Sequence, residues 1–152
     1  MRYRIGTGLL ALAFSVSADQ ANMDVGAEII GTCKIDQVTP IDFGDLEQGS
    51  TAPDRIMFGS VRYWCSKGQR YTMKTDGGAN AEGVGKWRMK GQASTNATEY
   101  LPYDLRPRRE SGTGLGPQAP ELFELEAEVK GRDYNALSVG GFLDTVTVTI
   151  SP

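Results

Sequence analysis

The clearest structural signal in the chain is the stretch Phe123-Glu124-Leu125-Glu126-Ala127-Glu128-Val129-Lys130, in which apolar and charged residues alternate without a break. An alternation of period two places the apolar side chains on one face of a β-strand, whereas a helix would distribute them around its circumference. We therefore predict a half-buried strand here. Similar alternation predicts further strands at Ile56 to Cys65, Tyr71 to Thr75, Trp87 to Lys90 and Phe142 to Ile150.

The segments between these strands have the composition of turns and loops, and the chain has 19 glycines. Asp76-Gly77-Gly78 is a turn signal, and the stretch Ser111 to Pro120 predicts a mobile loop. Tyr100 to Leu105 contains Pro102, which predicts an edge strand or a bulge because proline has no N–H to donate. Several short strands joined by such turns predict an all-β fold, either an antiparallel sandwich or a barrel.

Residues 1–18 have the layout of a secretory signal peptide. Arg2 and Arg4 precede an apolar run from Ile5 to Val16, and small residues follow up to Ala18. The run is 12 residues long, against about 20 for a helix that spans a membrane. We therefore expect export with cleavage after Ala18, rather than a membrane anchor.

The composition of the predicted mature chain, residues 19–152, excludes several classes of function. It keeps 14 basic and 19 acidic residues, and this net charge of −5 makes nucleic acid a poor partner. The chain has no histidine, which excludes His-based triads, and two cysteines alone cannot complete a structural zinc site. In an exported chain, Cys33 and Cys65 favour a disulfide over two free thiols. We predict no enzyme activity, no metal and no cofactor.

The residues after the predicted cleavage site form another strand pattern. Every second residue is apolar, namely Ala21, Met23, Val25, Ala27 and Ile29, with polar residues or glycine between them. Such a segment either forms the first strand of the domain's own sheet or pairs with another molecule by β-strand addition. The pattern alone leaves both alternatives open.

Six segments of the chain, taken in order, carry a resemblance to a known family. They are Met23 to Cys33, Asp42-Phe43-Gly44, Val61 to Cys65, Tyr71 to Gly78, Leu101 to Leu105 and Gly141 to Val148. Together they resemble the spore coat U domain family, the subunits of archaic (Csu-type) chaperone–usher pili. The resemblance implies an incomplete immunoglobulin-like β-sandwich without its final strand at residues 32–152, preceded by a donor-strand extension at residues 19–31.

The resemblance also implies a function and partners. It implies a structural subunit of a cell-surface fimbrium that passes through the periplasm, polymerises by donor-strand complementation and supports adhesion and biofilm formation. Its partners would be identical or related pilus subunits, a periplasmic chaperone and an outer-membrane usher. The five apolar N-terminal residues would fill a neighbour's groove, and Cys33–Cys65 would tie the first strand of the body to the second. The subunit's own acceptor groove would be lined by Phe142, Val146, Val148 and Ile150.

A free-energy argument supports donation by the N-terminal segment. Ordering about ten backbone residues costs more than the burial of Met23, Val25 and Ile29 returns. We therefore expect the free segment to be disordered and to become ordered only in a partner's groove. The alternative function is a secreted β-sandwich binding module for a carbohydrate or surface ligand, which has no need of a detachable strand.

Overall fold

The computed structural model describes residues 20–152, so the predicted signal peptide lies outside the described residues. The described chain is all-β with one short helix, and it contains no helix long and apolar enough to cross a membrane. Its elements are β1 (Cys33–Thr39), β2 (Arg55–Cys65), β3 (Arg70–Thr75), β4 (Trp87–Gly91), β5 (Tyr100–Pro107), β6 (Ser111–Thr113), β7 (Glu121–Val129), α1 (Gly131–Tyr134), β8 (Phe142–Leu143) and β9 (Val148–Ser151).

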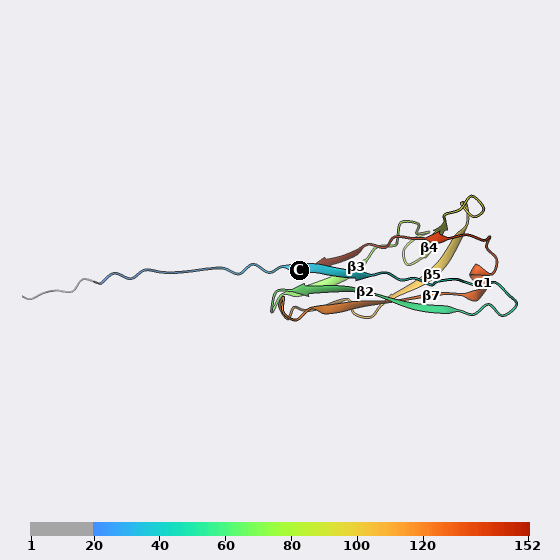
Figure 1. Ribbon diagram of the computed structural model, residues 1–152. Helices are drawn as coiled ribbons and strands as arrows, with labels where there is room; N and C mark the ends of the chain where they lie inside the picture. The colour runs from blue at the N-terminus through green and yellow to red at the C-terminus, as the bar shows by residue number, and fades with distance from the viewer. Residues whose placement is uncertain (1–19) are drawn as a thin grey trace, which may run out of the picture.

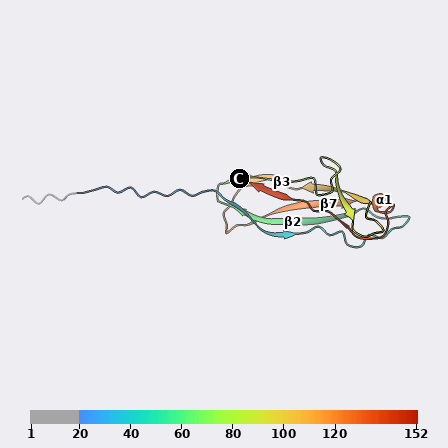
Figure 2. The same cartoon turned by 90° about the horizontal axis from the view of Figure 1, so that it is seen from above.

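The strands form two antiparallel sheets that enclose one main core. The larger sheet has the order β1-β2-β7-β5-β4-β8, and the smaller has the order β6-β3-β9. Tyr63 of β2 and Phe123 of β7 pack against Tyr71 and Met73 of β3 in this core, and all four side chains are buried. The fold is an incomplete immunoglobulin-like sandwich, as predicted. Figures 1 and 2 show the N-terminal segment leaving the body at the end where the C-terminus lies, while α1 lies at the opposite end.

Strand β7 lies inside the larger sheet and confirms the alternation from which the fold was predicted. It pairs with β2 along its whole length and with β5 through its second half. The apolar side chains Phe123, Leu125, Ala127 and Val129 are buried, whereas Glu124 is exposed. The strand assignment follows from this pattern because a strand turns successive side chains to opposite faces.

The prediction that Pro102 marks an edge strand or a bulge holds at Pro102 itself but is wrong for the strand as a whole. Strand β5 lies between β7 and β4, in the interior of the sheet. It pairs with β4 through its first half and with β7 only from Asp104 onward. Because β7 ends at Val129, no strand lies on the second side of Pro102 to require its missing N–H.

The prediction of a mobile loop at Ser111 to Pro120 is wrong for its first part. Ser111–Thr113 forms the edge strand β6, which pairs with β3. A Cβ on Gly112 would lie 2.3 Å from the hydroxyl of Tyr71, so this close approach requires glycine. The N–H of Gly114 then donates to the carbonyl of Gln69 at 2.7 Å. These contacts hold the segment against the smaller sheet.

The prediction of one continuous strand from Phe142 to Ile150 is also wrong. The segment forms β8, which pairs with β4 in the larger sheet, and β9, which pairs with β3 in the smaller sheet. Residues 144–147 cross between the two sheets. The predicted faces are nevertheless correct: Phe142, Val146, Val148 and Ile150 are half-buried, and the threonines between them are exposed.

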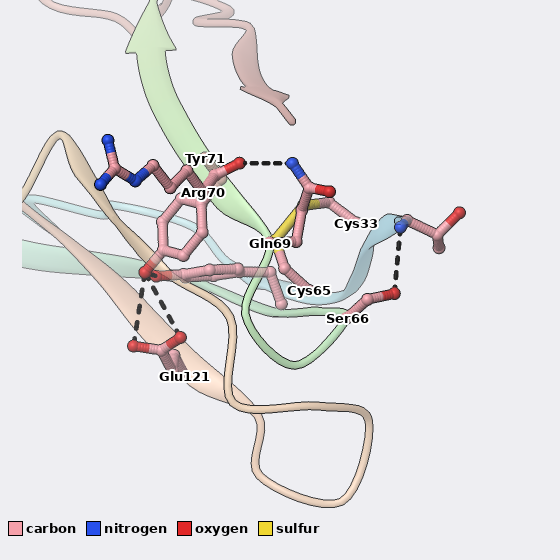
Figure 3. The surroundings of a disulfide bond; sticks show 9 residues. Cys33, Cys65, Ser66, Gln69, Arg70, Tyr71 and Glu121 are labelled. Carbon is pink, nitrogen blue, oxygen red and sulfur yellow. Dashed lines mark hydrogen bonds between the residues drawn. A yellow bond between two sulfur atoms is a disulfide. The ribbon is translucent and has the colours of Figure 1, made fainter. Parts of the chain in front are cut away.

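The Cys33–Cys65 disulfide is present and joins β1 to β2, as predicted. Figure 3 shows its surroundings, where the ring of Tyr71 and the carboxylate of Glu121 lie close by. The N–H of Thr32 donates to Ser66 Oγ at 3.0 Å, and the N–H of Ser66 donates to the carbonyl of Thr32 at 2.8 Å. The disulfide and these hydrogen bonds fix the beginning of β1, directly after the N-terminal segment.

Candidate functional site

A cavity of about 1130 Å³ opens into the sandwich and is the candidate functional site. We call it the groove. Its floor consists of side chains from the hydrophobic core on β2, β4, β5 and β7, namely Val61, Met89, Leu101, Tyr103, Leu105, Leu125 and Ala127. The groove therefore reaches down to the core of the fold, and most of the side chains on its floor are themselves buried.

Two strand edges that have no partner in the described chain border the groove. Strand β1 pairs only with β2, and β9 pairs only with β3. Val38 of β1 and Val148 of β9 both line the groove. Val38 lies opposite the buried Val61 in the ladder, yet it is 63% exposed. An inward-facing valine with this exposure indicates that a neighbouring strand is missing.

The segment after β1 forms one wall of the groove near α1. Ile41 packs over Gly59, where a Cβ would lie 2.6 Å from Ile41 Cγ1. Asp42 Oδ1 accepts a hydrogen bond from the N–H of Gly44 at 2.9 Å, and Gly44 has a φ of +64°, which favours glycine. The side chain of Gln48 donates to the carbonyl of Tyr134 at 2.9 Å and so ties this wall to α1.

Asp144 holds the opposite wall, where the chain crosses between the two sheets. Its Oδ1 accepts hydrogen bonds from the N–H of Asn80 at 3.1 Å and from Asn80 Nδ2 at 3.0 Å. Its Oδ2 accepts a hydrogen bond from the hydroxyl of Tyr103 at 2.8 Å. Burial raises the pKa of the Tyr103 hydroxyl, and the hydrogen bond to Asp144 raises it further. Gly78 has a φ of +83° and leaves no room for a Cβ beside Asp144.

Asp76 anchors the same wall at Thr147, three residues after Asp144. Its Oδ1 accepts hydrogen bonds from the N–H groups of Thr147 and Gly78, both at 2.9 Å. The bond from Thr147 is the main cause of the lowered pKa of Asp76. The N–H of Ala79 also donates to the carbonyl of Thr145 at 2.9 Å. The loop from Asp76 to Asn80 thus replaces a strand neighbour for the crossing segment.

The predicted acceptor residues lie close together, and three of the four line the groove. These are Phe142, Val146 and Val148. Ile150 does not line it; it pairs with Met73 and packs against the core. The sequence pattern did not assign the floor residues or the wall around Ile41 to the site. Their apolar alternation marked them as core, but nothing in that pattern shows which part of a core lies open.

The predicted donor residues lie in a segment that forms no strand in the structure. Residues 20–31 extend away from the body, as Figure 1 shows. Met23, Val25 and Ile29 are 87%, 91% and 93% exposed, and Ala21 and Ala27 are exposed as well. The first alternative, a strand in the domain's own sheet, is therefore wrong. Donation to another molecule stays a prediction.

A sequence profile of the Spore Coat Protein U domain matches residues 19–149. The chain belongs to the Spore Coat Protein U domain family. This family is structural and non-enzymatic, so the chain is not an enzyme. In residues 20–152, no three His, Cys, Asp or Glu side chains are grouped so that they could hold a metal ion. No curated protein matches the chain.

Two solved structures are similar to this Spore Coat Protein U domain. One is the CsuC–CsuE chaperone–tip adhesion subunit pre-assembly complex from archaic chaperone–usher Csu pili of Acinetobacter baumannii, with a TM-score of 0.53 and 18% identity over 80% of this chain. The other is a chaperone–tip adhesin complex of CFA/I fimbriae biogenesis, with a TM-score of 0.45 and 17% identity over 78% of this chain. This chain covers 40% and 41% of those chains. At such identity, the first likeness shows the fold alone.

Proposed function

We propose that this Spore Coat Protein U domain is a structural subunit of an archaic chaperone–usher pilus that polymerises by donor-strand complementation. Residues 19–31 of one subunit would fill the groove of the next, and residues 32–152 would form the accepting body. The observation that carries the proposal is the open groove, which is floored by core side chains and bordered by the free edges of β1 and β9. A single added strand would complete the sandwich.

The backbone of the groove supports strand addition in particular. A sheet edge presents unpaired N–H and C=O groups, and these are a template for another extended chain. An incoming strand between β1 and β9 would pair with both sheets and cover the exposed Val38. The alternate apolar side chains of the N-terminal segment have the spacing that such a strand needs, because successive side chains point to opposite faces.

The positions of the two ends support a fibre. The N-terminal segment leaves the body at the end opposite α1, whereas the groove wall around Asp42 and Gln48 is tied to α1 (Figures 1 and 2). A donor whose body lies beyond the α1 end of the acceptor would therefore reach the groove head to tail. This heterologous contact repeats without closing, and such contacts generate filaments.

The family also suggests the route and the partners of the subunit. After export and cleavage following Ala18, a periplasmic chaperone would cover the groove until an outer-membrane usher exchanges it for the donor segment of an identical or related subunit. One of the two similar solved structures is a pre-assembly complex of a chaperone with a tip adhesion subunit from archaic chaperone–usher pili, which supports a chaperone as a partner. At the cell surface the fimbrium would support adhesion and biofilm formation. We propose no cofactor.

A melting experiment on the mature chain tests the proposal. The acceptor is residues 19–152 with Val25→Asp, which disables its own donor segment and leaves the groove unchanged. A synthetic peptide of residues 20–31 should raise the melting temperature in a concentration-dependent way, because a ligand that binds only the folded state stabilises it. The same peptide with Val25→Asp is the control and should have no effect.

A body that ignores the native peptide over the whole concentration range would contradict donor-strand complementation. In that case the alternative, a secreted binding module for a carbohydrate or surface ligand, would account for the same fold. Glycan binding by the mature chain would then be the next measurement.

A further inference from the structure

The groove and the N-terminal segment carry charge of the same sign. The charged residues that line the groove are Asp42, Asp45 and Asp144, and no lysine or arginine is among the described residues that line it. The N-terminal segment has Asp24 and Glu28 among its polar positions, and residues 20–31 contain no basic residue. An acidic strand would therefore enter an acidic groove.

The three groove carboxylates differ in their surroundings. Asp144 accepts hydrogen bonds from Asn80 and Tyr103, which stabilise its charge within the wall. Asp42 and Asp45 are exposed, and within residues 20–152 the only hydrogen bond to their side chains comes from the N–H of Gly44 to Asp42. The carboxylates of these two aspartates are therefore exposed to solvent, and an incoming strand would pass close to them.

The geometry of a head-to-tail contact decides which donor charge comes close to them. Glu28 lies nearest to the donor's own body, and that body lies beyond the α1 end of the acceptor. Asp42 and Asp45 are exposed on the wall that Gln48 ties to α1, so Glu28, whose side chain turns out of the groove, would pass closest to them at its rim. Asp24 lies four residues further along the strand, at a distance of about 13 Å.

We propose that Asp42 and Asp45 are specificity-determining residues, which make the groove favour donor segments with neutral or basic polar positions. The inference rests on the proposed function. The occupant that fits best has the apolar spacing of residues 21–29 but no carboxylate at the positions of Asp24 and Glu28. When the chain's own segment docks, its carboxylates are repelled by those of Asp42 and Asp45. Salt weakens this repulsion because it screens exposed charges.

The test compares two peptides on the mature chain with Val25→Asp as acceptor. One peptide has the native sequence of residues 20–31, and the other carries Asp24→Asn and Glu28→Gln. At about 10 mM salt the neutral peptide should bind roughly three- to tenfold more tightly, since exposed charge pairs have effects of this order. At about 1 M salt, where the Debye length is about 3 Å, the ratio should approach one.

Variants of the acceptor locate the effect at the groove. Asp42→Asn with Asp45→Asn should bring the affinity for the native peptide to that of the neutral one, and asparagine retains the oxygen that accepts from Gly44. Glu82→Gln with Glu110→Gln makes the same change in net charge at exposed positions outside the groove and should leave the ratio unchanged.

Three results would overturn the inference. Equal affinities of the two peptides at low salt would show that the carboxylates do not select the donor. An equal gain from the Glu82 and Glu110 pair would assign the effect to net charge rather than to the groove. Failure of both peptides to bind at any salt concentration would remove donor-strand complementation itself, and this result is distinct from the other two.

Discussion

Residues 21–29 and 142–150 both alternate apolar and polar side chains, the second with a break at Leu143 and Asp144, yet only the second is paired in the structure. The first segment forms no strand, and its large apolar side chains are almost fully exposed. The second packs its apolar side chains against the core and pairs with β4 and then with β3. The difference lies in the neighbours, because the chain supplies partner strands for the second segment and none for the first. Alternation therefore specifies a segment that can form a strand, and the partner decides whether the strand forms.

Substitution of one apolar residue in each segment should give the largest contrast. Val25→Asp should abolish polymerisation, because it would bury an unpaired carboxylate in the neighbour's groove, and should change the stability of the body by less than about 0.5 kcal/mol. Ile150→Asp should destabilise the body by about 2–4 kcal/mol, since Ile150 packs against the core. Electron microscopy and urea unfolding measure the two effects, and fibres from Val25→Asp would contradict the comparison.

Removal of the disulfide tests the boundary between the free segment and the folded body. Cys33→Ala with Cys65→Ala should lower the free energy of unfolding by about 3–4 kcal/mol, since the bond closes a long loop in the unfolded chain. Guanidinium unfolding of the variant and of the parent, each with and without a reductant, measures the loss. The reductant should weaken only the parent; a parent that is insensitive to it would refute the prediction.

Loss of Asp144 should loosen the second segment where it crosses between the sheets. Asp144→Ala leaves the hydroxyl of Tyr103 and the backbone N–H of Asn80 without their acceptor, which should cost about 2–3 kcal/mol. Asp24→Ala removes a carboxylate from the first segment and should not change the stability. Denaturant unfolding of both variants provides the comparison, and equal effects would contradict the anchoring role of Asp144.

Acid should weaken the same segment through Asp76, with the smallest of these effects. The folded-state pKa of Asp76 is lowered from its ordinary value of 3.8. Its contribution to stability is therefore present above pH 3.8 and is lost as the pH falls through the lowered value. Asp76→Asn should remove this contribution, so the stability difference between parent and variant should shrink on acidification. A difference that is constant across that range would contradict the linkage.

The strands that the sequence predicted well are those with a local pattern and regular partners along their length. Phe123 to Val129 is one, because β2 and β5 lie beside it and its alternation alone is sufficient to predict a strand and its buried face. The predictions failed where the partner changes along the strand. Strand β5 has β7 beside it only from Asp104 onward, so it is an edge at Pro102 and an interior strand after it, and the segment after Asp144 leaves one sheet for the other.

The residues of the candidate site also divide into those that the sequence predicted and those that it did not. Phe142, Val146 and Val148, which were predicted as acceptor residues, line the cavity, and their role in accepting a strand stays a prediction. The floor around Leu101 and Leu125 could not be separated from the rest of the core, since all core residues share one apolar pattern. Whether such a residue faces another strand or an opening depends on contacts between distant parts of the chain.

The sequence by itself determined the all-β class, the faces of the strands and the pairing of the only two cysteines, because these follow from local periodicity and from residue counts. Only the tertiary structure decided that the sandwich is open between β1 and β9 and that residues 20–31 do not pair with either sheet. The physical reason is that local alternation governs which side of a strand is apolar, whereas the number of strands available to pair is a property of the whole fold.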